Sequence, residues 1–326
     1  MRIVVALGGN ALSPRGMDLT MAHQREAMRA ASSVLADVAA EHQLVITHGN
    51  GPQIGLLALQ VVAYDAESDL TLDVLDAESA GMVGYVIEQE LGNRLPAGRE
   101  VVTVLTTTLV DRDDPAFAEP TKFVGPVYDS ETARRLEHYR RWTIRPDGMW
   151  YRRVVPSPHP VAVAPLGPIG VLLDLGYVVV CGGGGGVPVC AGPYGMEGVE
   201  AVVDKDAVSA LIAEELDADL LVIATDVPHV YEGWGTADAH PLRLLDVVDL
   251  DPTTLQSGSM RPKVEAAARF ARSGGRAMIG ALSDLQDLVA GTAGTQVVDS
   301  HATGGGQEGS RRGSGPSALS AGHRAS

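Results

Sequence analysis

The chain has 326 residues, of which 45% are hydrophobic and 20% charged, a composition typical of a globular protein of two domains. Its formal net charge of −16 argues against a nucleic acid as the main partner, although a small anion could still bind in a local basic pocket. No apolar window is long enough for a membrane span or a signal peptide, and the two cysteines lack the spacing of a zinc site. We therefore expect a cytoplasmic protein with no nucleic-acid or membrane partner.

The N-terminal part of the sequence alternates between strand and helix patterns. Residues 2–7 form a continuous apolar run that stops at Gly8, as expected of a strand buried on both faces. A helical spacing of apolar residues over 28–38 follows, and then a second apolar run at 44–47. Strand, helix and strand in this order predict a βαβ unit and a parallel sheet. The same pattern continues with a strand over 100–106, a helix over 165–175 and a strand over 177–181.

The C-terminal part repeats this alternation. Asp204 is expected to cap a helix whose apolar face extends to residue 216. A strand over 220–225, a helix over 264–271 and a strand over 276–282 follow. The fold class is therefore α/β, and a boundary near residue 200 predicts two lobes, residues 1–200 and 201–298.

Two segments depart from this pattern. Residues 111–160 are rich in Pro, Arg, Tyr and Trp, with short strand-like pieces, and we interpret them as a small subdomain inserted into the first lobe. Residues 299–326 are rich in Gly and Ser without apolar periodicity, so we expect a disordered tail.

Glycine clusters follow three of the predicted strands. In parallel α/β sheets ligands bind at the carboxyl ends of strands, and the exposed N–H groups of glycine-rich turns form concave anion sites. The clusters therefore predict a small anionic ligand, although neither a P-loop nor a regular dinucleotide fingerprint is present. They comprise Gly8, Gly9 and Asn10; Gly49, Asn50 and Gly51; and a run of five glycines that includes Gly183 and Gly184.

Lysine is scarce: of 25 basic residues only Lys122, Lys205 and Lys263 are lysines. Each is beside a turn or a helix start, where a compact ammonium can follow a phosphoryl group better than the wide fork of arginine. Phosphoryl transfer depends on positioning and on neutralising charge, so we expect the three lysines to converge on one site. Asp206 is the candidate for orienting the lysines or the water shell of a bound magnesium ion, whereas Asp204 is assigned to the helix cap.

Several segments together resemble carbamate kinases, within the amino acid kinase superfamily. The resemblance implies a three-layer αβα sandwich with an open, mainly parallel sheet, two lobes and the inserted subdomain, assembled as a homodimer. The matching segments are VALGGNAL at 5–12, ITHGNGPQ at 46–53, DPAF at 114–117 with PTK at 120–122, RRVVPSP at 152–158, CGGGGGVP at 181–188, GVEAVVDKD at 198–206, and GSM at 258–260 with PKVEA at 262–266.

The same resemblance implies a reversible reaction between ATP and carbamate that gives ADP and carbamoyl phosphate, with Mg²⁺ arriving on the nucleotide rather than on protein ligands. It places Lys122, Lys205, Lys263 and Asp206 in catalysis. The glycine loops with Asn10 and Asn50 are implied to bind the acceptor and its phosphate. The nucleotide side is implied to include Thr225, Asp226, Tyr231 and Met260.

Three departures bear on these expectations. The family's usual Ser-Gln-Gly turn has Ala80 at its centre, and Arg261 stands where glycine is commoner. Phe123 also follows Lys122 where proline is frequent. Another feature supports the resemblance to carbamate kinases: unlike many superfamily members, the chain has no lysine just before Gly8, so Lys122 is expected to supply that charge. Two alternatives stay open at this point: a kinase of the same fold with a different carboxylate or phosphate acceptor, and a catalytically silent nucleotide-binding regulator.

Overall fold

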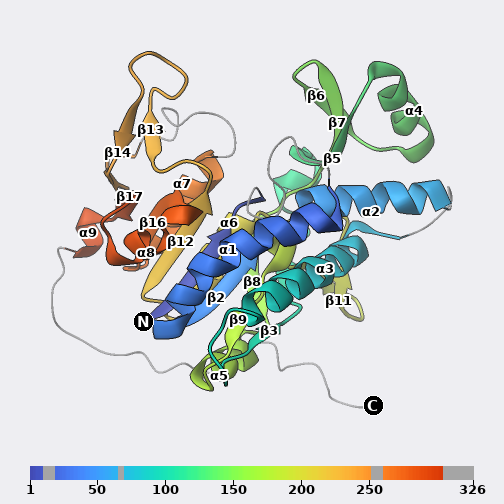
Figure 1. The fold of residues 1–326 in the computed structure, drawn as a ribbon. Coiled ribbons are helices and arrows are strands. Elements are labelled where there is room, and N and C mark those ends of the chain that lie inside the picture. Colours follow the sequence, from blue (N-terminus) through green and yellow to red (C-terminus); the bar gives the residue numbers. More distant parts are fainter. Residues whose placement is uncertain (10–18, 65–69, 251–259, 304–326) are drawn as a thin grey trace.

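The computed structural model describes residues 1–9, 19–64, 70–250 and 260–303. A central sheet of eight strands has the order β15-β17-β16-β12-β1-β2-β9-β3 (Figure 1). All its neighbouring pairs are parallel except β16 with β17. Its strands are β1 (Arg2–Leu7), β2 (Gln43–His48), β3 (Val101–Thr103), β9 (Val178–Val180), β12 (Leu220–Thr225), β15 (Leu244–Asp246), β16 (Arg276–Ala281) and β17 (Thr295–Val298).

Helices cover both faces of this sheet, because successive residues of a buried strand point to opposite sides. On β1, Ile3 and Val5 pack in one hydrophobic cluster and Val4 and Ala6 in another. The structure is therefore the expected three-layer αβα sandwich. The first face carries α1 (Met21–Glu41), α3 (Leu72–Gly92) and α8 (Leu285–Ala290), and the second carries α5 (Leu166–Asp174), α6 (Lys205–Glu215) and α7 (Met260–Arg272).

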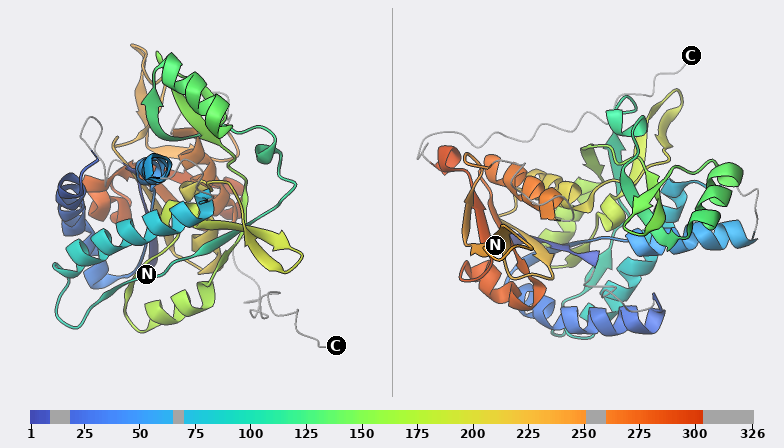
Figure 2. Two further views of the ribbon diagram at one scale, coloured as in Figure 1. Left: turned by 90° about the vertical axis from the view of Figure 1, so that its right-hand side faces the viewer. Right: turned by 90° about the horizontal axis from the view of Figure 1, so that it is seen from above.

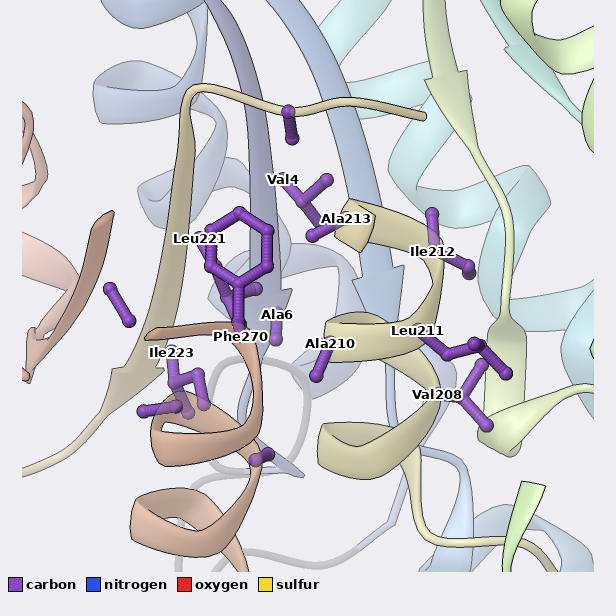
Figure 3. Packing of buried hydrophobic residues seen from close by; sticks show 14 of the residues in the cluster. Val4, Ala6, Val208, Ala210, Leu211, Ile212, Ala213, Leu221, Ile223 and Phe270 are labelled. Atoms are coloured by element: carbon purple, nitrogen blue, oxygen red, sulfur yellow. The ribbon is translucent and has the colours of Figure 1, made fainter. Parts of the chain in front are cut away.

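The second cluster joins the two predicted lobes. Figure 3 shows Val4 and Ala6 of β1 beside Leu221 and Ile223 of β12, with α6 and Phe270 of α7 packed over them. Because β1 pairs with β2 on one side and with β12 on the other, the sheet runs without interruption from one lobe to the next.

The inserted region is a separate small layer that projects from the sandwich (Figures 1 and 2). Its sheet has the order β5-β7-β6, with α4 beside it. β5 packs on α2 so closely that a Cβ at Gly55 would lie 1.9 Å from the Cα of Gly125. This backbone contact sets the position of β5, which begins at Lys122. The elements are α2 (Gly51–Tyr64), β5 (Lys122–Tyr128), α4 (Ser130–Arg140), β6 (Ile144–Asp147) and β7 (Trp150–Val155).

Two smaller sheets complete the fold. One has the order β11-β10-β4-β8, and the other is the hairpin β13–β14. Their strands are β4 (Thr107–Val110), β8 (Pro160–Ala164), β10 (Val187–Gly192), β11 (Gly195–Gly198), β13 (Val230–Glu232) and β14 (His240–Leu242). Short 3₁₀ turns are η2 (Pro115–Phe117), η3 (Gly183–Gly185) and η4 (Leu282–Asp284).

Two expectations are wrong in detail. The expected strand over 100–106 is split, because β3 ends at Thr103 and the chain crosses to pair with β10 and β8 from Thr107 onward. The expected tail does not begin at 299, since α9 (Ser300–Thr303) is helical, and residues 304–326 lie outside the described part. Among the described residues, no helix has the length and apolar character needed to cross a membrane.

Candidate active site

The carboxyl ends of β1, β2 and β9 lie side by side, because these strands are neighbours in a parallel arrangement. Their glycine loops therefore meet at one edge of the sheet, as expected for a ligand site. A Cβ at Gly8 would lie 3.0 Å from the carbonyl oxygen of Ala224, near the end of β12. No atom of the described residues lies within 4 Å of a Cβ at Gly9 or Gly51. Asn10 lies outside the described residues.

All three lysines are brought to this edge from separate segments. Lys205 begins α6 and donates to Oδ1 of Asp206 at 2.5 Å. Lys263, in the first turn of α7, donates to Oδ2 of the same carboxylate at 2.9 Å. Lys122, at the start of β5, donates to Asp204 at 2.5 Å. The structure thus joins the lysines through two carboxylates that belong to one helix start.

Burial makes this charge cluster electrostatically strong. Asp206 is 4% exposed and Lys263 8% exposed. Burial alone would raise the pKa of Asp206, but the ammonium groups of Lys205 and Lys263 hold it well below its ordinary value. For Lys205, burial lowers the pKa and the nearby Asp206 opposes this effect only in part. Asp206 is therefore an ionised anchor with two cations on its two oxygens.

Asp204 has two functions, one per carboxylate oxygen. Its Oδ1 caps α6 by accepting from the backbone N–H of Asp206 at 2.9 Å and of Ala207 at 3.4 Å, as expected. Its Oδ2 accepts from Lys122. Burial alone would raise the pKa of Asp204, but Lys122 keeps it below its ordinary value. The inserted layer is thereby tied to the positive end of a helix.

The second glycine loop lies directly against this cluster. A Cβ at Gly49 would lie 3.3 Å from Cδ of Lys205. A larger residue at position 49 would therefore crowd the lysine side chain. The carbonyl of Asn50 accepts from the backbone N–H of Ile54 at 2.9 Å, which makes Asn50 the first residue of the α2 turn. The N-terminus of α2 thus faces the same edge, where helix N–H groups favour an anion.

The five-glycine run has a different explanation from the one expected. Gly183 and Gly184 are buried, and the protein itself fills the space beside them. A Cβ at Gly183 would lie 2.7 Å from the His48 imidazole, and one at Gly184 would lie 2.3 Å from both Asn50 and Asp76. Packing against these side chains explains why both positions are glycine. The predicted phosphate contact at Gly183 and Gly184 stays a prediction.

His48 is enclosed by this packing. It is 1% exposed, and burial lowers its pKa to about 4. The imidazole is therefore neutral at pH 7 and stabilises the β2 end as a packing residue.

The predicted nucleotide-side residues fall into two places. Met260 begins α7, one turn before Lys263, and Thr225 ends β12, where its hydroxyl donates to Asp226 at 3.1 Å. Tyr231 lies farther along the chain on the β13–β14 hairpin. Its ring stands 5.1 Å from that of Trp234, centroid to centroid. The structure therefore ties Met260 to the lysine cluster through α7 and assigns Tyr231 to an aromatic cluster on the hairpin.

Two polar residues of α3 were missed at the sequence level. Asp76 and Ser79 are both fully buried, and both accept from the amide nitrogen of Asn50, at 2.5 and 2.7 Å. In the sequence, the only sign of a special role was that Asp76 and Ser79 lie in the segment 76–81, which includes Ala80 and departs from the family pattern. No local pattern links that segment to Asn50.

The chain is similar to known proteins over most of its length. The pattern described as "Amino acid kinase family" matches residues 1–280. The carbamate kinase of Rhizobium meliloti is 49% identical over 305 residues, 92% of this chain and 94% of that protein. The carbamate kinase of Haemophilus influenzae is 49% identical over 299 residues, 91% of this chain and 96% of that protein. The structure of carbamate kinase from Giardia lamblia bound to AMP-PNP has a TM-score of 0.82 at 35% identity and covers 91% of this chain and 98% of its own.

The chain belongs to the amino acid kinase family, and its relatives indicate a small-molecule phosphotransferase. Within that family its full-length relatives place it in the carbamate kinase group.

Proposed function

We propose that this chain transfers a phosphoryl group reversibly between ATP and carbamate, with ADP and carbamoyl phosphate on the other side of the reaction. The observation that carries the proposal is the convergence of Lys122, Lys205 and Lys263 at the glycine-lined carboxyl edge of the sheet. Relatives that cover almost the whole chain and are carbamate kinases support it.

The lysines serve the reaction through charge. An oxygen of carbamate attacks the γ-phosphorus, the bond from phosphorus to the bridging oxygen breaks, and ADP leaves. No proton moves, because the attacking oxygen is already anionic, and this suits a site whose histidine is buried and neutral. Asp206 holds Lys205 and Lys263 a fixed distance apart, so their remaining N–H groups follow the phosphoryl group in flight.

Lys122 completes the site from the acceptor side. It comes from the inserted layer and is anchored on Asp204 at the start of α6, beside Lys205. This position supplies the positive charge that the first glycine loop lacks. Closure of the inserted layer over bound ligands would keep water from an acyl phosphate, which hydrolyses readily.

Mg²⁺ belongs to the nucleotide substrate in this proposal. Among the described residues, no group of three His, Cys, Asp or Glu side chains could hold a metal ion. Both oxygens of Asp206 are already occupied by lysines. We therefore propose that the ion arrives on the phosphates of ATP or ADP and shields their charge there. A homodimer is proposed as well, from the resemblance alone, and light scattering of the purified chain tests it.

The deciding experiment measures ATP formed from ADP, Mg²⁺ and carbamoyl phosphate in a coupled assay. We expect carbamoyl phosphate to be used far more efficiently than acetyl phosphate. Turnover only with another acyl phosphate would assign a different acceptor, and binding of ADP without any turnover would make the chain a silent regulator. The intact lysine cluster argues against that last outcome.

A further inference from the structure

The side chain of Asn50 is held by α3 in one defined orientation. Its amide nitrogen donates to Oδ1 of Asp76 at 2.5 Å and to Oγ of Ser79 at 2.7 Å. The Ser79 hydroxyl in turn donates to the backbone carbonyl of Asp76 at 3.0 Å, which leaves it free to accept from Asn50. Both protons of the amide nitrogen are therefore used within the protein.

This arrangement determines what Asn50 can offer to a ligand. A carboxylate oxygen accepts but does not donate, so Asp76 selects the amide nitrogen rather than the amide oxygen of Asn50. The oxygen is left as the available side-chain atom, and among the described residues no donor is bonded to it. Oδ2 of Asp76 is completely buried without a hydrogen-bond partner among the described residues, but Oδ1 of Asn50 is not such an atom.

Asp76 is costly in its position, which argues that it is not there for stability. It is 0% exposed, and its Oδ2 has no hydrogen-bond partner in the part of the chain that the structure describes. Burial raises the pKa of this carboxyl to about 7, with Asp73 adding to the effect. In either protonation state Oδ1 still accepts from Asn50.

The chemistry of the substrate matches this orientation. Carbamate and carbamoyl phosphate carry an amino group, which donates hydrogen bonds, where acetate and acetyl phosphate carry a methyl group. Asn50 directly precedes α2 and follows Gly49, where a Cβ would lie 3.3 Å from Cδ of Lys205. In the proposed site the Asn50 amide therefore belongs to the acceptor side of the lysine cluster. A site built to hydrogen-bond an N–H group rejects an analogue that lacks it.

We propose that Asp76 and Ser79 are positioning residues that turn the Asn50 amide oxygen toward the acceptor, so that the site selects a substrate bearing an N–H donor. This inference rests on the proposed function and adds the determinant of its specificity. The test compares kcat/KM for carbamoyl phosphate with kcat/KM for acetyl phosphate, with ADP as the acceptor in both cases.

We expect Asp76→Ala to lower the ratio of these two constants about tenfold or more, because the freed amide presents its nitrogen to the amino group of the substrate. The acetyl phosphate rate is expected to change little, since a methyl group is indifferent to the orientation. Ser79→Ala is expected to shift the ratio in the same direction. Asp76→Asn keeps an acceptor oxygen but adds a donor, so with Ser79 still accepting from Asn50 it should retain more of the ratio than Asp76→Ala. Glu78→Gln, an exposed change on the same helix, serves as the matched control.

Thermal unfolding of each variant shows whether it is folded. If Asp76→Ala does not fold, the ratio of the two kcat/KM values in Ser79→Ala tests the inference instead. A ratio within about twofold of the parent protein in a folded variant would overturn the inference, as would equal losses for both substrates. If the parent protein makes no ATP from carbamoyl phosphate, the proposed function fails instead.

Discussion

Lys263 donates to Oδ2 of Asp206 at 2.9 Å across 57 residues of sequence, and this bond joins the first turn of α7 to the first turn of α6. The two side chains are only 10% and 5% exposed, so the pair is buried together with Lys205. Two helix starts and two cations are thereby fixed around one carboxylate, which is the central feature of the site.

Lys205→Arg should reduce the turnover of carbamoyl phosphate about 100-fold or more while leaving the fold intact. A guanidinium keeps the charge, but its flat fork cannot take the place of a compact ammonium between Gly49 and Asp206. Steady-state kinetics and circular dichroism measure the two effects. Arg272→Lys, an exposed exchange at the end of α7, is the control. Unchanged turnover in Lys205→Arg would refute the role given to this ammonium.

Asp206→Asn should lower the free energy of unfolding at pH 7 by about 3 kcal/mol or more, because it leaves two buried ammonium groups without a counter-ion. The pKa of Asp206 is lowered in the folded chain, so its contribution is present above the ordinary value of 3.8 and is lost as the pH falls below that value. Urea unfolding of both proteins from pH 7 down to pH 3 measures the difference. A difference that does not shrink toward pH 3 would contradict this assignment.

Asp76→Asn should have the opposite pH dependence. The pKa of Asp76 is raised from 3.8 to about 7, so the folded chain binds a proton that the unfolded chain has released between these values. The stability that Asp76 contributes is therefore full below about pH 4 and is lost as the pH rises to about 7. Relative to the parent protein, the variant should gain stability, on the order of a few kcal/mol, over this window. Denaturant midpoints at pH 4.5 and pH 7.5 provide the measurement, and a gain that is the same at both would show that Asp76 is ionised throughout.

Gly184→Ala should destabilise the chain by more than about 2 kcal/mol. Gly184 has φ +69°, and a Cβ there would lie 2.3 Å from the bonded atoms of Asn50 and Asp76. Gly81→Ala is the matched control, because Gly81 lies within α3 and a Cβ there would meet none of the described residues within 4 Å. The change should stabilise the helix by about 0.5–1 kcal/mol. Equal effects at the two glycines would mean that the Asn50–Asp76 contact tolerates displacement.

Much of the fold follows from local patterns in the sequence. The apolar run at 2–7 is β1, and the cap at Asp204 begins α6, because burial on both faces and capping each leave a signal within a few residues. The run at 100–106 was misjudged because a continuous apolar run does not record which sheet each half joins.

The site was predictable only where composition carried the information. The scarcity of lysine indicated that Lys122, Lys205 and Lys263 act together, and they do share one charge cluster. By contrast, Asp76 lies 26 residues from Asn50 on a different helix, and no periodicity links the two. For the same reason the glycines at 183 and 184 suggested a bound ligand, although the neighbours that require them are the protein's own side chains.

The placement of β1 between β2 and β12 bears on whether the two parts of the chain can fold separately. If the chain were divided near residue 200, β1 would remain in one fragment and β12 in the other. Each of these buried strands would lose its backbone hydrogen bonds to the other and expose apolar side chains to water. Each fragment would expose part of the shared hydrophobic core, so we expect the parts before and after residue 200 to unfold together as one cooperative unit.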